Sequence, residues 1–267
     1  MTKRMIKIQT ADGTCRAGLF TPNGEAKAAV ILYMDIFGLR PALDEMAGRL
    51  VAAGYAVLVP DLFYRFADKP EFDTKAFADD DKKAQLFGMM RETTQAKTIA
   101  DTGAFLDALS AEGFSGPAGV TGYCMGGARA LNAAGAYPDR IAAAASFHGG
   151  NLATDAEDSP HRRATDMKGR IYVGAAGVDG SFPPEQAGLL ERTLREAEVD
   201  HVIENYVGMK HGWCVPDHSV FDAAGAERHR LAVAGMVAQR RRLLPGRRLG
   251  DQGDGAVEAD GQHVVVL

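Results

Sequence analysis

The amino-acid sequence predicts an α/β protein with a single doubly wound, mainly parallel sheet and helices on both faces. Short, continuously apolar segments alternate with amphipathic helical segments over most of the chain, as strand–helix–strand units require. No internal repeat and no linker interrupts this alternation. The 267 residues are 46% hydrophobic and 24% charged, a composition that suits one large domain with a substantial core.

The first expected elements are a β-hairpin and two buried strands. Residues 5–20 alternate around Asp12-Gly13, a dipeptide that favours a tight hairpin turn. The apolar segments 28–34 and 56–60 have the composition of strands that are covered on both faces. Between them, apolar residues at helical spacing predict a helix over residues 43–51.

The elements of the second half follow a polar segment. Residues 63–92 are polar and irregular, and we expect an excursion over the edge of the sheet that covers the active site. A helix over residues 99–109 comes next. Beyond it the patterns predict strands over residues 117–121, 141–147, 170–176 and 201–206, and helices over 128–136, 183–197 and about 221–241.

The composition changes near the C-terminus. A basic cluster lies within residues 240–248, and residues 249–262 are rich in glycine, aspartate and glutamine. We expect residues 1–242 to form the domain and residues 243–267 to form a flexible tail. A docking segment for an anionic partner is the alternative for this tail.

Charge and cysteine content limit the setting and the partners. The net charge of −5 and the pI near 5.8 favour neither a nucleic acid nor an anionic membrane as partner. No apolar run reaches the length of a membrane span, and the N-terminal residues lead into a strand pattern. The three cysteines form no CxxC pair. We expect a cytoplasmic protein that is a monomer or a small homo-oligomer and whose partner is a small molecule.

The segment Gly122-Tyr123-Cys124-Met125-Gly126-Gly127 has the strand–turn–helix pattern of a nucleophile elbow, with cysteine as the nucleophile. The glycines allow the strand and the helix to cross closely around a strained turn. The helix dipole favours a thiolate at Cys124. A buried cysteine beside a glycine-rich turn is the alternative interpretation.

A cysteine nucleophile needs a base, and seven histidines are available. His148 and His211 both lie in glycine-flanked loops after strands. Hydrolases built on such elbows have the chain order nucleophile, acid, histidine, and His211 leaves room for the acid. His148 is then expected to line the pocket. Solvated or capping roles are expected for the remaining histidines, His161, His201, His218, His229 and His263.

Asp179 is the expected acid, because it ends a strand between the elbow and His211. From an adjacent strand end its carboxylate can meet the imidazole. An N-cap of the following helix is the alternative role for Asp179. Asp158, Asp166 and Glu191 are weaker candidates for the acid, since they lie in loop or helix.

The loop after strand 28–34 contributes two further candidates. The amides of Ile36 and Met125 are expected to stabilise an oxyanion. Asp35, at the same strand end, would lie near Cys124 and oppose a resting thiolate there. A solvated loop carboxylate is the alternative for Asp35.

The residues that carry these predictions resemble the dienelactone hydrolase family over roughly residues 5–235. The shared motifs are Asp35-Ile36-Phe37-Gly38, Pro60-Asp61-Leu62, Gly122-Tyr123-Cys124-Met125-Gly126-Gly127, Asp179 with Phe182-Pro183-Pro184-Glu185, and His211-Gly212. The resemblance implies an α/β-hydrolase fold and a triad of Cys124, Asp179 and His211. It also implies hydrolysis of small esters or lactones through a thioester. The best-known members act on an enol-lactone that bears a carboxylate.

Two departures from the family pattern concern the thiol and the substrate. The family usually has glutamate where Asp35 stands, and that glutamate is thought to help ionise the thiol, so Asp35 is expected to modulate Cys124. The better-known members also have an arginine where this chain has Val215. The candidates for substrate binding are therefore Arg65, Arg91, His148 and Trp213, with Lys82 and Lys83 as weaker ones.

Two other functions remain compatible with the sequence. Cys124 could serve a non-catalytic or redox-responsive binding protein on the same fold. A metal site of Cys124, His211 and Cys214 lacks ligand-like spacing. We expect neither a metal nor another cofactor.

Overall fold

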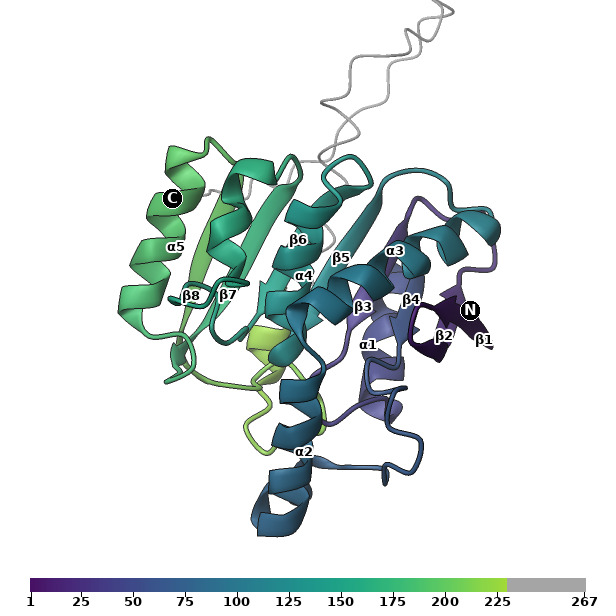
Figure 1. Cartoon of the computed structure of the whole chain (residues 1–267), viewed down its shortest axis with the longest axis horizontal. Coiled ribbons are helices and arrows are strands. Elements are labelled where there is room, and N and C mark those ends of the chain that lie inside the picture. The colour runs from purple at the N-terminus through teal and green to yellow at the C-terminus, as the bar shows by residue number, and fades with distance from the viewer. Residues whose placement is uncertain (230–267) are drawn as a thin grey trace, which may run out of the picture.

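A computed structural model describes residues 1–229 of the chain. They form one eight-stranded sheet in the order β1-β2-β4-β3-β5-β6-β7-β8 (Figure 1). The strands are β1 (Thr2–Thr10), β2 (Gly13–Thr21), β3 (Ala29–Tyr33), β4 (Ala56–Pro60), β5 (Ala118–Tyr123), β6 (Ile141–Phe147), β7 (Arg170–Val178) and β8 (His201–Lys210). Strands β3 to β8 are parallel, and only the β1–β2 and β2–β4 pairs are antiparallel. The predicted mainly parallel sheet is confirmed.

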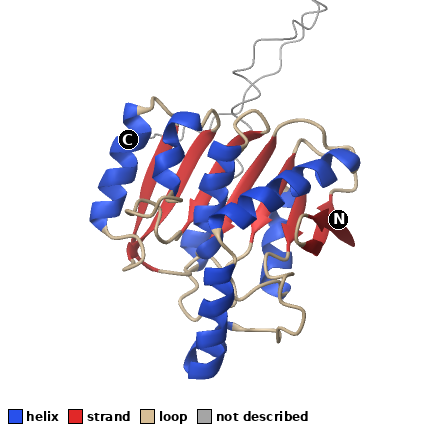
Figure 2. Ribbon diagram, viewed as in Figure 1, coloured by secondary structure: helices blue, strands red, loops and turns tan. Residues whose placement is uncertain are grey.

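The helices cover both faces of the sheet, as Figure 2 shows in blue. They are α1 (Pro41–Ala52), the 3-10 helix η1 (Thr74–Ala78), α2 (Asp80–Glu92), α3 (Gln95–Ala111), α4 (Met125–Ala136), the 3-10 helix η2 (Pro160–Asp166) and α5 (Pro184–Glu196). In Figure 1, α3, α4 and α5 lie in front of the sheet and α1 lies behind it. Every residue of the central strands β3, β4 and β5 is buried, because helices cover these strands on both faces.

The expectation of an irregular segment over residues 63–92 is wrong for its second half. Residues 80–92 form α2, whose N-cap Asp79 accepts hydrogen bonds from the amides of Asp81 and Lys82. The sequence pattern does not predict this helix, because only Leu86 and Met89 are buried and the helix lacks an apolar stripe. It extends beyond the edge at which the parallel strands end (Figure 1).

The last predicted elements lie partly outside the described residues. A helical segment begins at residue 223 and continues to residue 229, which agrees with the start of the helix predicted over 221–241. The rest of that helix, His263 and the expected tail over 243–267 lie outside residues 1–229. No helix within residues 1–229 is long and apolar enough to cross a bilayer.

Candidate active site

The turn between β5 and α4 holds Cys124 in a strained conformation. Its φ of 54° and ψ of −118° lie where residues with a side chain are rarely found. A Cβ on Gly122 would lie 1.9 Å from the carbonyl oxygen of Gly126. A Cβ on Gly126 would lie 2.5 Å from the carbonyl oxygen of Tyr33 in β3. The strand and the helix can therefore cross here only because both positions are glycine, and the turn presents Cys124 at the end of the sheet.

His211 and Asp179 meet at the ends of the neighbouring strands β8 and β7. The His211 Nδ1 atom lies 2.7 Å from Asp179 Oδ2. Ser181 holds the same carboxylate, since its amide and its hydroxyl donate to Asp179 Oδ1 over 2.9 and 2.6 Å. Burial would raise the pKa of Asp179, but the hydrogen bonds with His211 and Ser181 hold it below its ordinary value. Asp179 does not cap α5, whose N-cap is Pro183.

The imidazole of His211 also interacts with the Cys124 side chain. Burial lowers the pKa of His211, but its interactions with Asp179 and Cys124 outweigh this effect and raise the pKa to about 10. Cys124 itself is half-buried and forms no disulfide. The structure thus brings thiol, imidazole and carboxylate together from the ends of β5, β8 and β7.

The amides of Ile36 and Met125 follow the ends of β3 and β5 and are the expected oxyanion donors. Met125 is the first residue of α4, so its N–H has no acceptor within that helix. In the turn after β3, Phe37 N donates to Asp35 Oδ1 over 3.0 Å and Gly38 N donates to the Asp35 carbonyl over 3.3 Å. The amide of Ile36, between them, donates to no loop or turn carbonyl within residues 1–229. Within residues 1–229, each of the two amides can therefore donate to another group.

Asp35 is fully buried and carries two partners that the sequence did not indicate. Two nitrogens of Arg40 donate to its two carboxylate oxygens over 2.6 and 2.8 Å. His218 Nε2 lies 3.3 Å from Asp35 Oδ2, and Asp217 accepts two further hydrogen bonds from Arg40. Burial alone would raise the pKa of Asp35, but His218 and Arg40 hold it below its ordinary value. The alternative of a solvated loop carboxylate is wrong.

Replacing Arg40 with methionine is expected to destabilise the fold by about 3–5 kcal/mol at pH 7, because it leaves the Asp35 carboxylate buried with its main partner removed. Arg49→Met is the matched control: Arg49 pairs with Glu45 on the surface of α1, where a pair contributes about 1 kcal/mol or less. Urea unfolding measures both variants.

The loss of stability expected for Arg40→Met depends on pH. A lowered carboxyl pKa in the folded state stabilises the fold above the ordinary carboxyl pKa, and this contribution disappears as the pH falls through the lowered value. The difference between wild type and Arg40→Met should therefore shrink towards low pH. Equal losses for the Arg40 and Arg49 variants at pH 7 would contradict a structural role for the Asp35–Arg40 pair.

The residues considered for substrate binding do not gather in one place. Arg65 forms salt bridges with Asp12 and Asp101, at distances of 2.7 and 2.8 Å, at the end of the sheet occupied by β2 and β4. Arg91 is exposed on α2. His148 and Trp213, by contrast, are buried beside the triad, and the His148 ring centroid lies 4.7 Å from that of His211. Lys82 pairs with Asp79 at the start of α2, and Lys83 is exposed.

Three histidines expected to be solvated or capping have buried partners instead. His218 contacts Asp35, as described above. His161 shares a hydrogen bond of 2.9 Å with Ser159, and His229 shares one of 2.9 Å with the Tyr123 hydroxyl. The His218 and His229 contacts join residues far apart in the sequence, so local sequence pattern could not predict them. Only the Ser159–His161 contact is local. Ser181 could have been found, because its spacing of two residues from Asp179 is that of an Asx turn.

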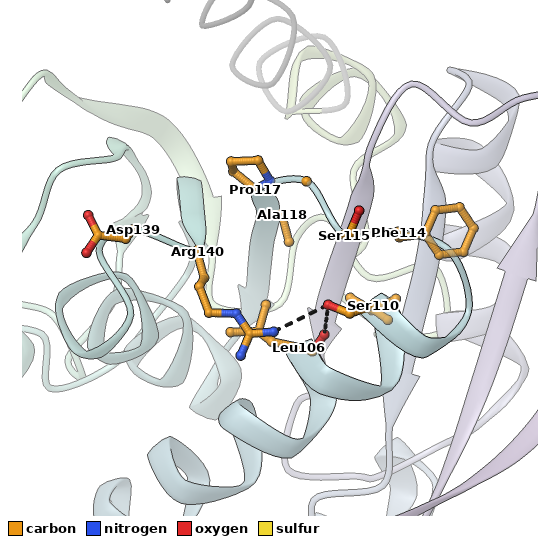
Figure 3. Close-up of a pocket in the computed structure, with 10 residues that line it drawn as sticks. Leu106, Ser110, Phe114, Ser115, Pro117, Ala118, Asp139 and Arg140 are labelled. Carbon is orange, nitrogen blue, oxygen red and sulfur yellow. Dashed lines mark hydrogen bonds between the residues drawn. The ribbon is translucent and has the colours of Figure 1, made fainter.

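The cavities of the described residues lie at two edges of the sheet. Figure 3 shows one of about 80 Å³ between the end of α3, the turn before β5 and Arg140, at the edge where the parallel strands begin. An open groove of about 630 Å³ lies at the opposite edge, beside Arg40, Asp217 and Phe72. The catalytic chemistry of such sheets is found at the edge where the strands end, which is the edge of the groove. None of Cys124, His211 and Asp179 lines the groove.

No group of three or more histidine, cysteine, aspartate or glutamate side chains within residues 1–229 could hold a metal ion. Cys214 is buried, and within residues 1–229 it forms no such group with Cys124 and His211.

The sheet order, the strained cysteine at a strand–helix turn, and the imidazole and carboxylate at later strand ends together define an α/β-hydrolase. The sequence profile of the dienelactone hydrolase family matches residues 15–240. The chain therefore belongs to the dienelactone hydrolase family, and it is a hydrolase of carboxylic esters or lactones.

Individual relatives agree with this placement. The chain is 31% identical over 188 residues to a carboxymethylenebutenolidase of Pseudomonas putida, which covers 69% of this chain and 75% of the relative. It is 26% identical over 202 residues to an Escherichia coli K12 protein classed with the same enzymes, covering 74% and 72%. A crystal structure of a Klebsiella pneumoniae protein classed with the dienelactone hydrolases superposes with a TM-score of 0.79 at 20% identity, covering 89% and 98%. At that identity the superposition shows the shared fold.

Proposed function

We propose that the chain hydrolyses a small carboxylic ester or lactone with a triad of Cys124, His211 and Asp179, through a thioester intermediate. The observation that carries the proposal is the position of the His211 imidazole, which shares a hydrogen bond of 2.7 Å with Asp179 and interacts with the Cys124 side chain. Its raised pKa keeps the imidazole protonated at neutral pH, so the imidazole can stabilise a thiolate at Cys124.

In the first half of the reaction the thiolate of Cys124 attacks the carbonyl carbon of the ester. The negative charge moves to the carbonyl oxygen, where the amides of Ile36 and Met125 donate hydrogen bonds. The tetrahedral intermediate then expels the alkoxide, which takes the proton from His211 Nε2. The products of this half are a thioester on Cys124, a free alcohol and a neutral His211.

In the second half water attacks the thioester carbonyl and gives its proton to the neutral His211. Collapse of the second tetrahedral intermediate breaks the carbon–sulfur bond and returns the thiolate of Cys124. The acid product leaves, and the imidazolium–thiolate pair is restored. Asp179 keeps the imidazole oriented and stabilises its charge in both halves.

Substrates without a carboxylate fit this site better than the lactone acids of the best-known family members. The position that holds an arginine in those members is Val215, which is fully buried. Arg65 is already engaged by two carboxylates.

The test combines a substrate screen with mass analysis of the protein. Neutral esters and lactones should be turned over faster than carboxylate-bearing analogues of the same size, and acid quenching during turnover should trap one acyl group on Cys124. A modified Cys124 without turnover would instead indicate a non-catalytic or redox-responsive binding protein. Acyl groups on another residue would exclude the proposed triad.

The cytoplasm is the setting that we propose for this reaction. Cys15, Cys124 and Cys214 are all free, and a nucleophilic thiol survives best in a reducing compartment.

A further inference from the structure

His148 ends the strand that lies between the nucleophile and the rest of the triad. The sheet order places β6 beside β5, and β7 and β8 beyond it. Three strand spacings, about 14 Å, separate β5 from β8, and the loop after β8 brings His211 back towards Cys124. His148, which follows β6, lies between the two strand ends along the sheet.

The imidazole of His148 is buried against His211 and Trp213. Its exposed fraction is 1%, and its ring centroid lies 4.7 Å from that of His211 and 5.3 Å from that of Trp213. Burial and the charge of His211 hold the pKa of His148 well below its ordinary value, so the ring is neutral. A neutral imidazole has one nitrogen that donates and one that accepts.

Neither ring nitrogen of His148 has a hydrogen-bond partner within residues 1–229. A buried polar group without a partner costs about 1–3 kcal/mol, and a phenyl ring of similar shape would avoid that cost. Packing alone therefore does not explain an imidazole at this position. The chemistry of the two nitrogens, one donor and one acceptor, matches a water molecule or the oxygen of a bound substrate.

The backbone of His148, like that of Cys124, has a positive φ and an amide that donates to the neighbouring strand. The φ of His148 is 37°, in the left-handed region, and its amide donates to the Gly174 carbonyl over 2.9 Å. Cys124 N donates to the Phe147 carbonyl over 3.1 Å, which links the two strand ends. The next residue is Gly149, where a Cβ would lie 2.2 Å from Ser146 Oγ. Two strained residues on adjacent strand ends are thus fixed relative to each other.

We propose that His148 is a positioning residue that holds the hydrolytic water beside His211 in the second half of the reaction. The inference rests on the proposed triad mechanism. One ring nitrogen of His148 forms a hydrogen bond with the water, whose proton passes to the neutral His211 as its oxygen attacks the thioester carbonyl. His148 itself gains and loses no proton.

Rapid mixing with an activated ester such as p-nitrophenyl acetate separates the two halves of the reaction. The burst of p-nitrophenolate reports formation of the thioester, and the steady-state rate reports its hydrolysis. For His148→Phe we expect the burst rate to stay within about threefold of wild type and the hydrolysis rate to fall about 10- to 100-fold. The acyl group should accumulate on Cys124, where mass analysis detects it.

Two further variants distinguish hydrogen bonding from packing. His148→Asn, which restores a donor and an acceptor, should recover part of the hydrolysis rate, whereas His148→Phe preserves the ring shape only. His161→Phe removes another buried imidazole, in η2 and away from the triad, and should change neither rate. Thermal unfolding verifies that each variant is folded.

Three results would overturn the proposal: equal losses in burst and hydrolysis rates, no loss in His148→Phe, or no recovery in His148→Asn. Failure of the triad mechanism gives a different result, because wild type would then form no acyl group on Cys124 at all. If His148→Phe fails to fold, His148→Asn is compared with wild type instead. Retained hydrolysis in His148→Asn would support the proposal, and an equal loss of the burst rate and the hydrolysis rate would contradict it.

Discussion

Cys124→Ala is expected to lower ester turnover by about 10⁴- to 10⁶-fold, because the covalent intermediate of the proposed mechanism forms on its thiol. The residual rate would come from the two oxyanion amides and from binding of the substrate. Alanine is smaller than cysteine and the position is half-buried, so the fold should remain intact. Initial rates on a neutral ester, with the circular dichroism spectrum as a check of folding, measure both effects.

Cys15→Ala is the matched control for this variant. Cys15 is also a free cysteine, but it is buried in β2, where its thiol contacts the carbonyl of Asp61. Its replacement should leave turnover unchanged. Turnover in Cys124→Ala equal to that of wild type would exclude cysteine catalysis in this chain.

Asp179→Asn is expected to reduce turnover by about 10⁴-fold, the size of the loss measured when the carboxylate of a hydrolase triad becomes an amide. The amide carries no charge to stabilise the imidazolium and favours the wrong tautomer of His211. Asp166→Asn, on the exposed end of η2, should leave turnover unchanged. A similar loss in both variants would contradict the role of Asp179.

The same variant is expected to move the alkaline limit of activity. In wild type the pKa of His211 is about 10, so the proton needed for the leaving group is retained up to that pH. Without the Asp179 charge this pKa falls towards its ordinary value near 6.5, and activity should decline at lower pH. The pH–rate profiles of wild type and Asp179→Asn measure the shift.

The free energy of unfolding should also depend on the titration of His211. A raised histidine pKa in the folded state stabilises the fold below the ordinary pKa near 6.5, and this contribution is lost as the pH rises through about 10. Asp179→Asn should therefore be less stable than wild type at pH 6 and approach it above pH 10. Urea unfolding at the two pH values provides the comparison.

The sequence was informative where chemistry depends on short, local patterns. Gly122, Gly126 and Gly127 around Cys124 indicated a tight strand–helix crossing, and the structure has the strained turn that this crossing needs. The apolar segments that became β3, β4 and β5 identified the buried centre of the sheet. Such patterns are readable because neighbours in the chain are neighbours in space.

Local pattern failed where polar groups meet over long distances. The helix α2 buries only two residues and so has no periodic signal. The Asp35–Arg40 pair joins residues close in sequence, but His218, which completes it, comes from the loop after β8. Residue type made Arg65 a candidate for substrate binding, but in the structure its guanidinium forms salt bridges with Asp12 and Asp101. Charge and residue type do not reveal which oppositely charged partner is near.

By itself, the sequence determined the α/β class, the turn that presents Cys124, and the chain order in which Asp179 and His211 follow it. These depend on apolar periodicity, on the steric requirement for glycine, and on the order of loops at one edge of a parallel sheet. Only the tertiary structure decided that His211 meets Cys124 across β7 and β6, and that the charge of Asp35 is paired with Arg40. It also decided that His148 packs against the His211 imidazole without a hydrogen-bond partner for its ring within residues 1–229. Each of these depends on distances of a few ångströms between side chains from separate strands, and such distances are set by how the whole sheet packs.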